Sequence, residues 1–437
     1  MLKRKVYQQL IDWKSSQQRK RKALLVTGAR QIGKSYIIRH FGMMQYKALI
    51  EINLLEDRAA QQSLSRATDT QDFINRLMLI ARTEPVDGST LIFIDEIQES
   101  PDIMTYAKFL VEDGRFDYAF SGSMLGAAFK GVRSFPVGFV TEIEMRPLDF
   151  EEFCWATLPT TSPLDATRQA FLDQKPLEKY IHDTLIAAFR SYVIVGGMPE
   201  IVQQFADVGT LEHIRPLQLE LNRQYAYDIS QYAGRRALQV QAIFDELPVQ
   251  LEETNVKFAV TSLDKTARYD RFEQDFIWIT RAGVGLKVNR VTEPRPPLRR
   301  TQKASNFKLY QSDTGMLVAR FSQSLARAIY EDSRTVNMGG VFENVIAQEL
   351  VAAQFEPYYF MSRKAGEVDF LIEGENGIVA LEVKSGRDYL THASLAKAMH
   401  APGYEIDRGI VLCRSNFEVR DGILYAPWYA SICFSQL

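Results

Sequence analysis

A glycine-rich loop between an apolar run and a helical stretch constrains this chain more than any other feature. Residues 28–35 read Gly-Ala-Arg-Gln-Ile-Gly-Lys-Ser and fit the pattern Gly-x-x-x-x-Gly-Lys-[Ser/Thr]. The apolar residues 24–26 ahead of the loop are typical of a buried parallel strand, and residues 35–41 can continue as a helix. This order of strand, loop and helix predicts an α/β sheet whose first turn binds phosphate groups.

Each position of the loop has a predicted role. Gly28 and Gly33 allow the tight backbone path that turns successive N–H groups toward phosphate oxygens. Lys34 is expected to reach the β- and γ-phosphates of a nucleotide, and the Ser35 hydroxyl to ligate Mg²⁺. The full set of predicted nucleotide-binding residues is Gly28, Ala29, Arg30, Gln31, Ile32, Gly33, Lys34 and Ser35.

A second element supplies carboxylates. Residues 91–96 read Leu-Ile-Phe-Ile-Asp-Glu, so a buried strand is predicted to end in Asp95 and Glu96 at the carboxyl edge of the sheet. Asp95 is expected to contact Mg²⁺ through water, and Glu96 to orient and deprotonate an attacking water. The alternative is a surface acidic pair after a core strand. Ser121, with Ser123 beside it, is a possible γ-phosphate sensor, or else part of a turn rich in small residues.

The composition is that of an ordinary globular chain. Its 437 residues are 46% hydrophobic and 24% charged, with a net charge of −2. We find no apolar run of about 18 residues and no signal peptide, so no membrane contact and a cytoplasmic location are expected. The three cysteines and five histidines lack zinc-ligand spacing.

Five segments are predicted along the α/β chain. Residues 1–22 form a basic helical lead-in, and residues 23–148 an ASCE-type P-loop core with a parallel sheet. Residues 149–235 have the periodicity of a helical lid. Residues 236–325 are typical of a winged-helix-like module, and a Pro-rich stretch at 293–298 cannot be a central strand. Residues 326–437 return to α/β.

The last segment carries charged residues at the spacing of a PD-(D/E)xK-like nuclease. Asp369 lies in one apolar strand, and Glu382 and Lys384 lie on one face of the next, because the side-chain period of a strand is two. Glu343, on the preceding helix, is the predicted accessory acid. Asp369 and Glu382 would hold a divalent metal, and Lys384 would position water. The alternative is a structural ion pair on an inherited fold.

Two basic stretches are possible contacts for DNA. Residues 1–22 contain eight Lys or Arg against one acid. Residues 281–308 contain eight Lys or Arg against one Glu, a net charge of +7 (8 − 1). The alternative for both stretches is a solvated surface.

These motifs together resemble the AAA+/STAND-like P-loop ATPases of bacteria and archaea that carry a C-terminal restriction-endonuclease-like domain of unknown function. Besides the loop at 28–35, the shared segments are Ile52-Asn-Leu54, Ile94-Asp-Glu-Ile-Gln98, Ser121-Gly-Ser123, Pro147-Leu-Asp-Phe-Glu-Glu-Phe153, Gly196-Gly-Met-Pro-Glu200, Tyr227-Asp-Ile229, Gly340-Val-Phe-Glu-Asn344, Glu367-Val-Asp-Phe370 and Glu382-Val-Lys384. The resemblance implies ATP as the nucleotide, its probable hydrolysis, a lid, a winged module and a nuclease-like C-terminal fold.

One departure from that family concerns turnover. Many relatives carry an arginine where this chain has Phe139, and such a residue can neutralise charge on the γ-phosphate. Arg133, Arg146 and Arg30 are nearby substitutes, with Arg133 the preferred one, and a partner subunit could also supply an arginine. Three hypotheses follow: a Mg²⁺-dependent ATPase or ATP-gated switch, a DNA-binding regulator with negligible turnover, and an ATP-controlled nuclease.

Overall fold

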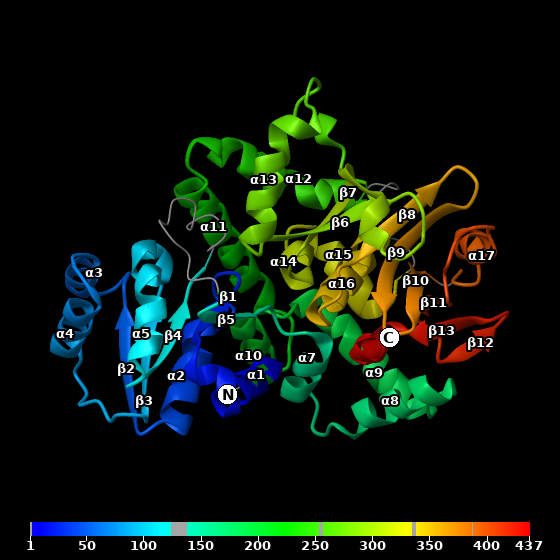
Figure 1. Ribbon diagram of the computed structural model, residues 1–437. Coiled ribbons are helices and arrows are strands. Elements are labelled where there is room, and N and C mark those ends of the chain that lie inside the picture. Colours follow the sequence, from blue (N-terminus) through cyan, green and yellow to red (C-terminus); the bar gives the residue numbers. More distant parts are fainter. Residues whose placement is uncertain (1, 124–137, 253–256, 334–337, 387) are drawn as a thin grey trace. The chain divides into compact units, whose positions relative to one another are not determined.

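The computed structural model describes residues 2–123, 138–252, 257–333, 338–386 and 388–437. Its residues cluster in two compact units. Unit 1 contains Lys3–Arg146 with Arg281–Gly283, and unit 2 contains Pro147–Thr280 with Val284–Leu437. Figure 1 shows unit 1 mostly in blue and cyan and unit 2 in green to red.

Unit 1 is built on a five-stranded parallel sheet in the order β2-β3-β4-β1-β5. Every residue of β1 and β3 is buried, because helices cover both faces of a parallel sheet and select continuous apolar runs. The edge strand β2 instead alternates buried and half-buried residues. The strands are β1 Ala23–Thr27, β2 Ala48–Asn53, β3 Thr90–Asp95, β4 Asp117–Ser121 and β5 Val140–Glu144.

The helices of unit 1 sandwich this sheet. One face packs against α3, α4 and α5 in a single apolar cluster. The helix α2 contacts the strands β2, β3 and β4, and α1 packs Trp13 against Phe41 of α2 with ring centroids 6.4 Å apart. The predicted lead-in is thus a packed part of this unit. The helices are α1 Lys5–Ser15, α2 Lys34–Gln45, α3 Arg58–Ser65, α4 Thr70–Ile80 and α5 Ala107–Asp113.

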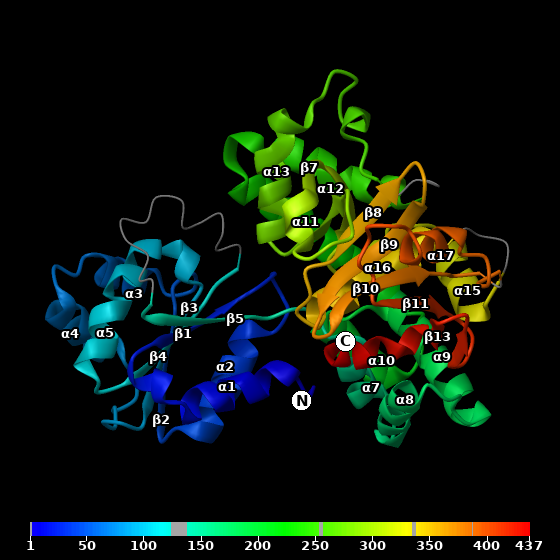
Figure 2. The same cartoon turned by 45° about the vertical axis from the view of Figure 1, so that its right-hand side comes forward.

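Unit 2 contains a mixed eight-stranded sheet in the order β12-β13-β11-β10-β9-β8-β6-β7. Its central pairs β10–β11 and β11–β13 are parallel, and β9 pairs antiparallel with both β8 and β10. Figure 2 shows these strands in orange and red. The strands are β6 Gly285–Val291, β7 Gln302–Gln311, β8 Tyr358–Ser362, β9 Gly366–Gly374, β10 Gly377–Val383, β11 Arg408–Cys413, β12 Glu418–Arg420 and β13 Ile423–Pro427.

Helices make up the rest of unit 2. Several of them have Asp or Pro in the first turn or at the N-cap, including the capping box that Asp149 and Glu152 form at α7. The helices are α7 Phe150–Thr157, α8 Ser162–Asp173, α9 Lys179–Val195, α10 Pro199–Val208, α11 Ile214–Tyr232, α12 Ala237–Glu252, α13 Tyr269–Arg281, α14 Thr314–Val318, α15 Gln323–Glu331, α16 Gly339–Ala352 and α17 Ala393–Met399.

The helix α16 is buried on all sides and carries polar residues into the core of unit 2. The Asn344 side chain accepts a hydrogen bond from the Gln311 N–H (2.7 Å) and donates one to the Gln311 carbonyl (3.0 Å) on β7. The Glu349 carboxylate accepts from the Tyr192 hydroxyl (2.8 Å), the Phe150 N–H (3.0 Å) and the Ser431 hydroxyl (2.8 Å). The helix therefore joins α7, α9, β7 and the C-terminal turn.

The α/β class and the parallel P-loop sheet predicted from sequence are confirmed. The predicted strand at 24–26 lies in β1, and the one that ends at Asp95 is β3. Asp369 and Glu382 lie in β9 and β10, which are neighbouring strands as predicted. The domain boundary predicted between residues 325 and 326 runs through one sheet, because β6 pairs with β8 and β7 pairs with β6. None of the described helices has the length and apolarity that a bilayer crossing requires.

Candidate functional site

The glycine-rich loop follows β1 and turns into α2 through residues with positive φ. Gly28, Gln31 and Gly33 have φ of 135°, 63° and 87°. A Cβ on Gly28 would lie 2.1 Å from the carbonyl oxygen of Met145, so glycine is required where the loop crosses the end of β5. The loop therefore packs directly against the backbone that follows β5, and α2 begins at Lys34.

Lys34 is almost fully buried in this loop. Its ammonium donates to the carbonyl oxygens of Ala29 (2.7 Å) and Gly28 (3.2 Å). Burial lowers the pKa of Lys34 to about 8, against the opposing charges of Glu96 and Asp95. Ser35 is half-buried at the start of the same helix.

Asp95 lies at the end of β3 between two neighbouring strands. Its carboxylate accepts from the Ser121 hydroxyl of β4 and from the Asn53 amide of β2 (3.4 Å). The predicted sensor Ser121 therefore contacts the predicted metal-binding carboxylate directly. Since β2, β3 and β4 are adjacent and parallel, their carboxyl ends bring these three side chains to one edge of the sheet.

Glu96 adopts a left-handed backbone conformation, with φ of 55°. Its carboxylate accepts a short hydrogen bond from the Gln98 amide, which also lies 3.5 Å from the Ser123 hydroxyl. A non-glycine residue with positive φ at the end of a strand is a frequent sign of a functional site. Sequence reasoning did not assign a role to Gln98 or Asn53. Both residues lie in the motifs quoted above, but only the structure shows that Gln98 donates to Glu96 and Asn53 to Asp95.

The three arginines proposed as substitutes for the arginine missing at position 139 differ in their surroundings. Arg133 lies outside the described residues. Arg146 donates to Glu144 (2.6 Å), and its carbonyl accepts from Arg4 (2.5 Å), so it is tied to β5 and to the N-terminal segment. Arg30 carries a charge close enough to oppose protonation of Lys34.

Phe139 lies where the resemblance described above places an arginine, and its ring packs near Lys108. Its ring centroid lies 5.3 Å from the Lys108 ammonium, and its carbonyl accepts from the Ala23 N–H (2.9 Å) at the start of β1. The position therefore serves the packing of β5 beside β1.

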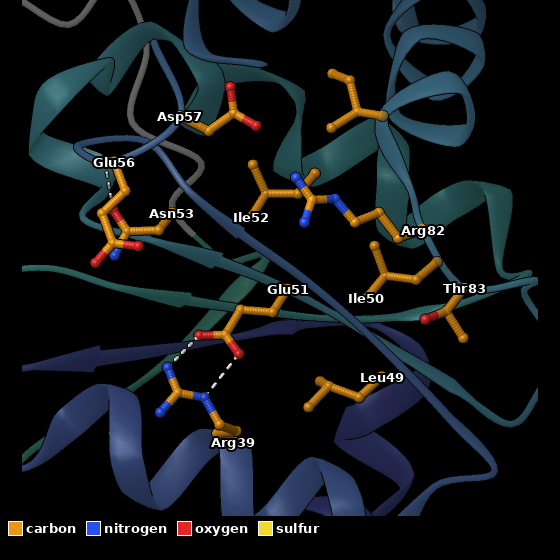
Figure 3. A pocket seen from close by; sticks show the side chains of 11 residues that line it. Arg39, Leu49, Ile50, Glu51, Ile52, Asn53, Glu56, Asp57, Arg82 and Thr83 are labelled. Atoms are coloured by element: carbon orange, nitrogen blue, oxygen red, sulfur yellow. Dashed lines mark hydrogen bonds and ion pairs between the residues drawn. The ribbon is translucent and has the colours of Figure 1, made fainter. Parts of the chain in front are cut away.

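A cavity of about 760 Å³ opens on the outer side of β2. Figure 3 shows it with Arg39 of α2 and Glu51 of β2 joined by two hydrogen bonds (2.6 and 2.8 Å). Asn53 is the link to the loop site, because it lines this cavity and also reaches Asp95. None of the residues 28–35 lines the cavity.

In unit 2, the structure brings together the predicted charges of the C-terminal cluster. The Lys384 ammonium lies 2.8 Å from Glu382. The Val383 N–H donates to Asp369 (2.8 Å). Burial and the charge of Glu382 raise the pKa of Asp369 well above its usual range, and burial raises the pKa of Glu382. Glu343 enters this cluster through Lys308, a residue that the sequence had placed in a basic surface stretch.

The two basic stretches are only partly solvent-facing. In the first, Arg4 is buried and donates to the Ile32 carbonyl (3.3 Å). In the second, Lys308 is fully buried, and the Lys287 ammonium lies 4.5 Å from the Phe307 ring centroid. Lys308 therefore cannot contact DNA from the stretch 281–308, and Lys287 is half-buried there. The basic side chains that stay exposed in this stretch are Arg281, Arg299, Arg300 and Lys303.

Across the described residues, no group of three or more His, Cys, Asp or Glu is arranged to hold a metal ion. The loop site of unit 1 does not require such a group, since Ser35 and Asp95 would supply two ligands and phosphate and water the others. The C-terminal pair Asp369 and Glu382 is also smaller than such a group, so the metal role of these two carboxylates stays a prediction.

The parallel sheet, the loop at its first turn and the carboxylates at its edge define a P-loop domain. In agreement, residues 20–154 match the family model described as "AAA domain". Residues 186–326 and 338–430 match two models described as domains of unknown function, DUF8612 and DUF4143. The two models divide unit 2 near residue 330, although the sheet continues across that point.

Three known proteins are similar to parts of the chain. The uncharacterized protein MJ1544 of Methanocaldococcus jannaschii is 24% identical over 366 residues, which cover 81% of this chain and 73% of the relative. The Orc1 protein of Aeropyrum pernix, solved with DNA, is 12% identical with a TM-score of 0.24, covering 71% of this chain and 86% of that one. The DnaA protein of Aquifex aeolicus, solved with AMPPCP, is 13% identical with a TM-score of 0.26, covering 63% and 82%.

We predict that Gly28→Ala destabilises unit 1 strongly, because the new Cβ would meet the Met145 carbonyl at 2.1 Å as well as strain the backbone. The expected loss is roughly 3 kcal/mol in the free energy of unfolding. Gly88→Ala is the matched control, since Gly88 also has positive φ (69°) but has no atom within 4 Å of its would-be Cβ. It should cost about 1 kcal/mol. Urea denaturation measures both, and equal losses would contradict the close approach.

Proposed function

We propose that this protein binds ATP with Mg²⁺ at the loop of residues 28–35 and hydrolyses it. The observation that carries the proposal is the buried Lys34 ammonium, held in a loop of positive-φ residues beside Asp95 and Glu96. A buried cation in a cradle of backbone N–H groups at a helix N-terminus is a site for a phosphate chain. The choice of ATP over other nucleotides follows the resemblance to the AAA+ family.

The residues of the site divide the work of hydrolysis. Lys34 would exchange its two loop carbonyls for phosphate oxygens, and Ser35 and Asp95 would hold the metal. When bound there, Mg²⁺ supplies charge neutralisation on the phosphate oxygens. Ser121 and Asn53 fix the orientation of the Asp95 carboxylate through their hydrogen bonds. Glu96 would accept the proton of the attacking water.

Slow intrinsic turnover belongs to the same proposal. Gln98 donates to one oxygen of the Glu96 carboxylate, so the other oxygen remains to accept the proton of the attacking water. Phe139 stands where relatives carry an arginine, and Arg146 is paired with Glu144. Arg133 or an arginine from a partner subunit therefore remains the proposed source of the missing charge. An ATP-gated switch in the cytoplasm, rather than a fast motor, suits such a site.

Lys34→Ala should raise the Kd for ATP at least tenfold, because the buried cation that faces the phosphates is lost. Glu96→Gln should keep the affinity and lower kcat by about 10²–10⁴, since only proton transfer is removed. Lys47→Ala, an exposed lysine of the same unit, is the control and should change neither quantity. Calorimetric titration and phosphate release measure these effects. Wild-type affinity in Lys34→Ala would refute the proposed site.

The lowered pKa of Lys34 makes ATP binding depend on pH. Below pH 8 the free protein already carries the ammonium, and above it the amine is mostly neutral. Bound phosphates favour the ammonium and raise its pKa, so binding must take up a proton above pH 8 and the affinity must fall there. Titrations at pH 8.5 in two buffers of different ionisation enthalpy should show uptake of roughly half a proton or more. Lys34→Arg should abolish this uptake, and persistence would assign the proton to another group.

DNA binding is a second candidate function, favoured by the exposed side chains of Arg299, Arg300 and Lys303 in unit 2. If they contact phosphates, replacing all three with Ala should weaken binding of duplex DNA and reduce the slope of log K against log salt by about 3. Lys175→Ala, an exposed lysine elsewhere in the unit, is the control. Fluorescence anisotropy with and without ATP measures both the slope and any switching. An unchanged slope in the triple variant would exclude this surface.

A further inference from the structure

Lys308 lies in the middle of a carboxylate cluster of unit 2, with its side chain fully buried. Its ammonium is 2.9 Å from Glu343, 2.7 Å from Glu367 and 3.8 Å from Asp369. The three acids come from α16 and β9, whereas Lys308 comes from β7 at the far edge of the sheet. Its side chain passes the ring of Tyr359 on β8, whose centroid is 5.4 Å from the ammonium.

The position of this ammonium is that of a cation enclosed by its ligands. Burying an ammonium is costly unless several oxygens compensate it, and three carboxylates within 4 Å do so here. The Tyr310 hydroxyl donates to Glu343 (2.7 Å) and so takes up a further lone pair of that carboxylate. A divalent metal bound by Glu343 and Asp369 would have to occupy the space that Lys308 already fills.

One oxygen of Glu382 accepts from the Lys384 ammonium (2.8 Å), and its second oxygen is buried without a hydrogen-bond partner. That second oxygen is an open position of the cluster. The Glu343 oxygen that could share a metal with it already faces Lys308 and Tyr310. The cluster therefore keeps the acids of the predicted metal site, and the Lys308 ammonium supplies a positive charge among them.

We propose that the Lys308 ammonium is the permanent cation of this cluster, so that Asp369, Glu382 and Glu343 bind no divalent metal while Lys308 is present. The C-terminal sheet then keeps the residues of a metal-dependent phosphodiester-cleaving site as a structural core without that activity. This proposal is independent of ATP binding in unit 1. Removing the Lys308 ammonium should therefore leave a site that binds a divalent cation.

The test compares Mn²⁺ binding by the nucleotide-free full chain in the wild type, in Lys308→Met and in each with Asp369→Asn added. The wild type should show no Mn²⁺ binding that depends on Asp369. Lys308→Met should gain one Asp369-dependent site, which lowers its Kd for Mn²⁺ at least tenfold relative to the double variant Lys308→Met/Asp369→Asn. Mn²⁺ should also raise the melting temperature of Lys308→Met. Lys175→Met, which changes an exposed lysine of the same unit, is the control and should resemble the wild type.

Two results would overturn the proposal. The first is Asp369-dependent Mn²⁺ binding, or Lys384-dependent cleavage of DNA or RNA, by the wild type. The second is a folded Lys308→Met variant that gains no site. If that variant folds only when Mn²⁺ is supplied, the result supports the proposal, and if it folds under neither condition, the wild-type arm alone decides. ATP binding by Lys308→Met separates these outcomes from failure of the unit 1 site.

Discussion

Unit 2 depends on the need to compensate the polar side chains that α16 carries into its core. A buried carboxylate or amide without partners costs more free energy than a whole apolar contact contributes, so its partners are obligatory. The Asn344 side chain bonds to both the N–H and the carbonyl of Gln311. The Glu349 carboxylate accepts hydrogen bonds from three separate segments of the chain. Glu343 takes Lys308 and Tyr310 of β7. The edge hairpin β6–β7 is thereby joined to the rest of the sheet by charge as well as by backbone pairing.

Unit 1 depends on a different constraint, the parallel alignment of its strands. Three adjacent strand ends bring Asn53, Asp95 and Ser121 to one edge, and the loop after β1 reaches the same edge because β1 pairs with β4. The Met145 carbonyl behind Gly28 keeps the loop from collapsing onto β5. The backbone geometry of the strands and of the loop therefore brings Lys34 and the carboxylates to the same edge of the sheet.

The sequence predicted the part of this protein that local pattern determines. The continuous apolar runs before Gly28 and Asp95 predicted buried parallel strands, and residue spacing placed Lys34, Asp95 and Glu96 in one site. Partners far apart in sequence could not be predicted in the same way. Lys308 looked like one charge among eight in a basic stretch, since nothing near it in sequence reveals that it faces α16. Gln98 and Asn53 lie in the motifs, but their hydrogen-bond acceptors, Glu96 and Asp95, are known only from the structure. The arrangement around Arg133 lies outside the described residues.

The hydrogen bonds of Glu349 also bear on how unit 2 can be made. Its three donors lie at residues 150, 192 and 431, so the carboxylate is compensated only when nearly the whole unit has been synthesised. Contacts this distant in sequence form late and slowly, because long loops must close first. On the ribosome, the helices that precede α16 would therefore wait for the last residues of the chain, whereas unit 1 from Lys3 to Arg146 can complete its sheet early. Small losses at the C-terminus, such as removal of the turn that contains Ser431, would then act on assembly of the entire unit rather than on its end.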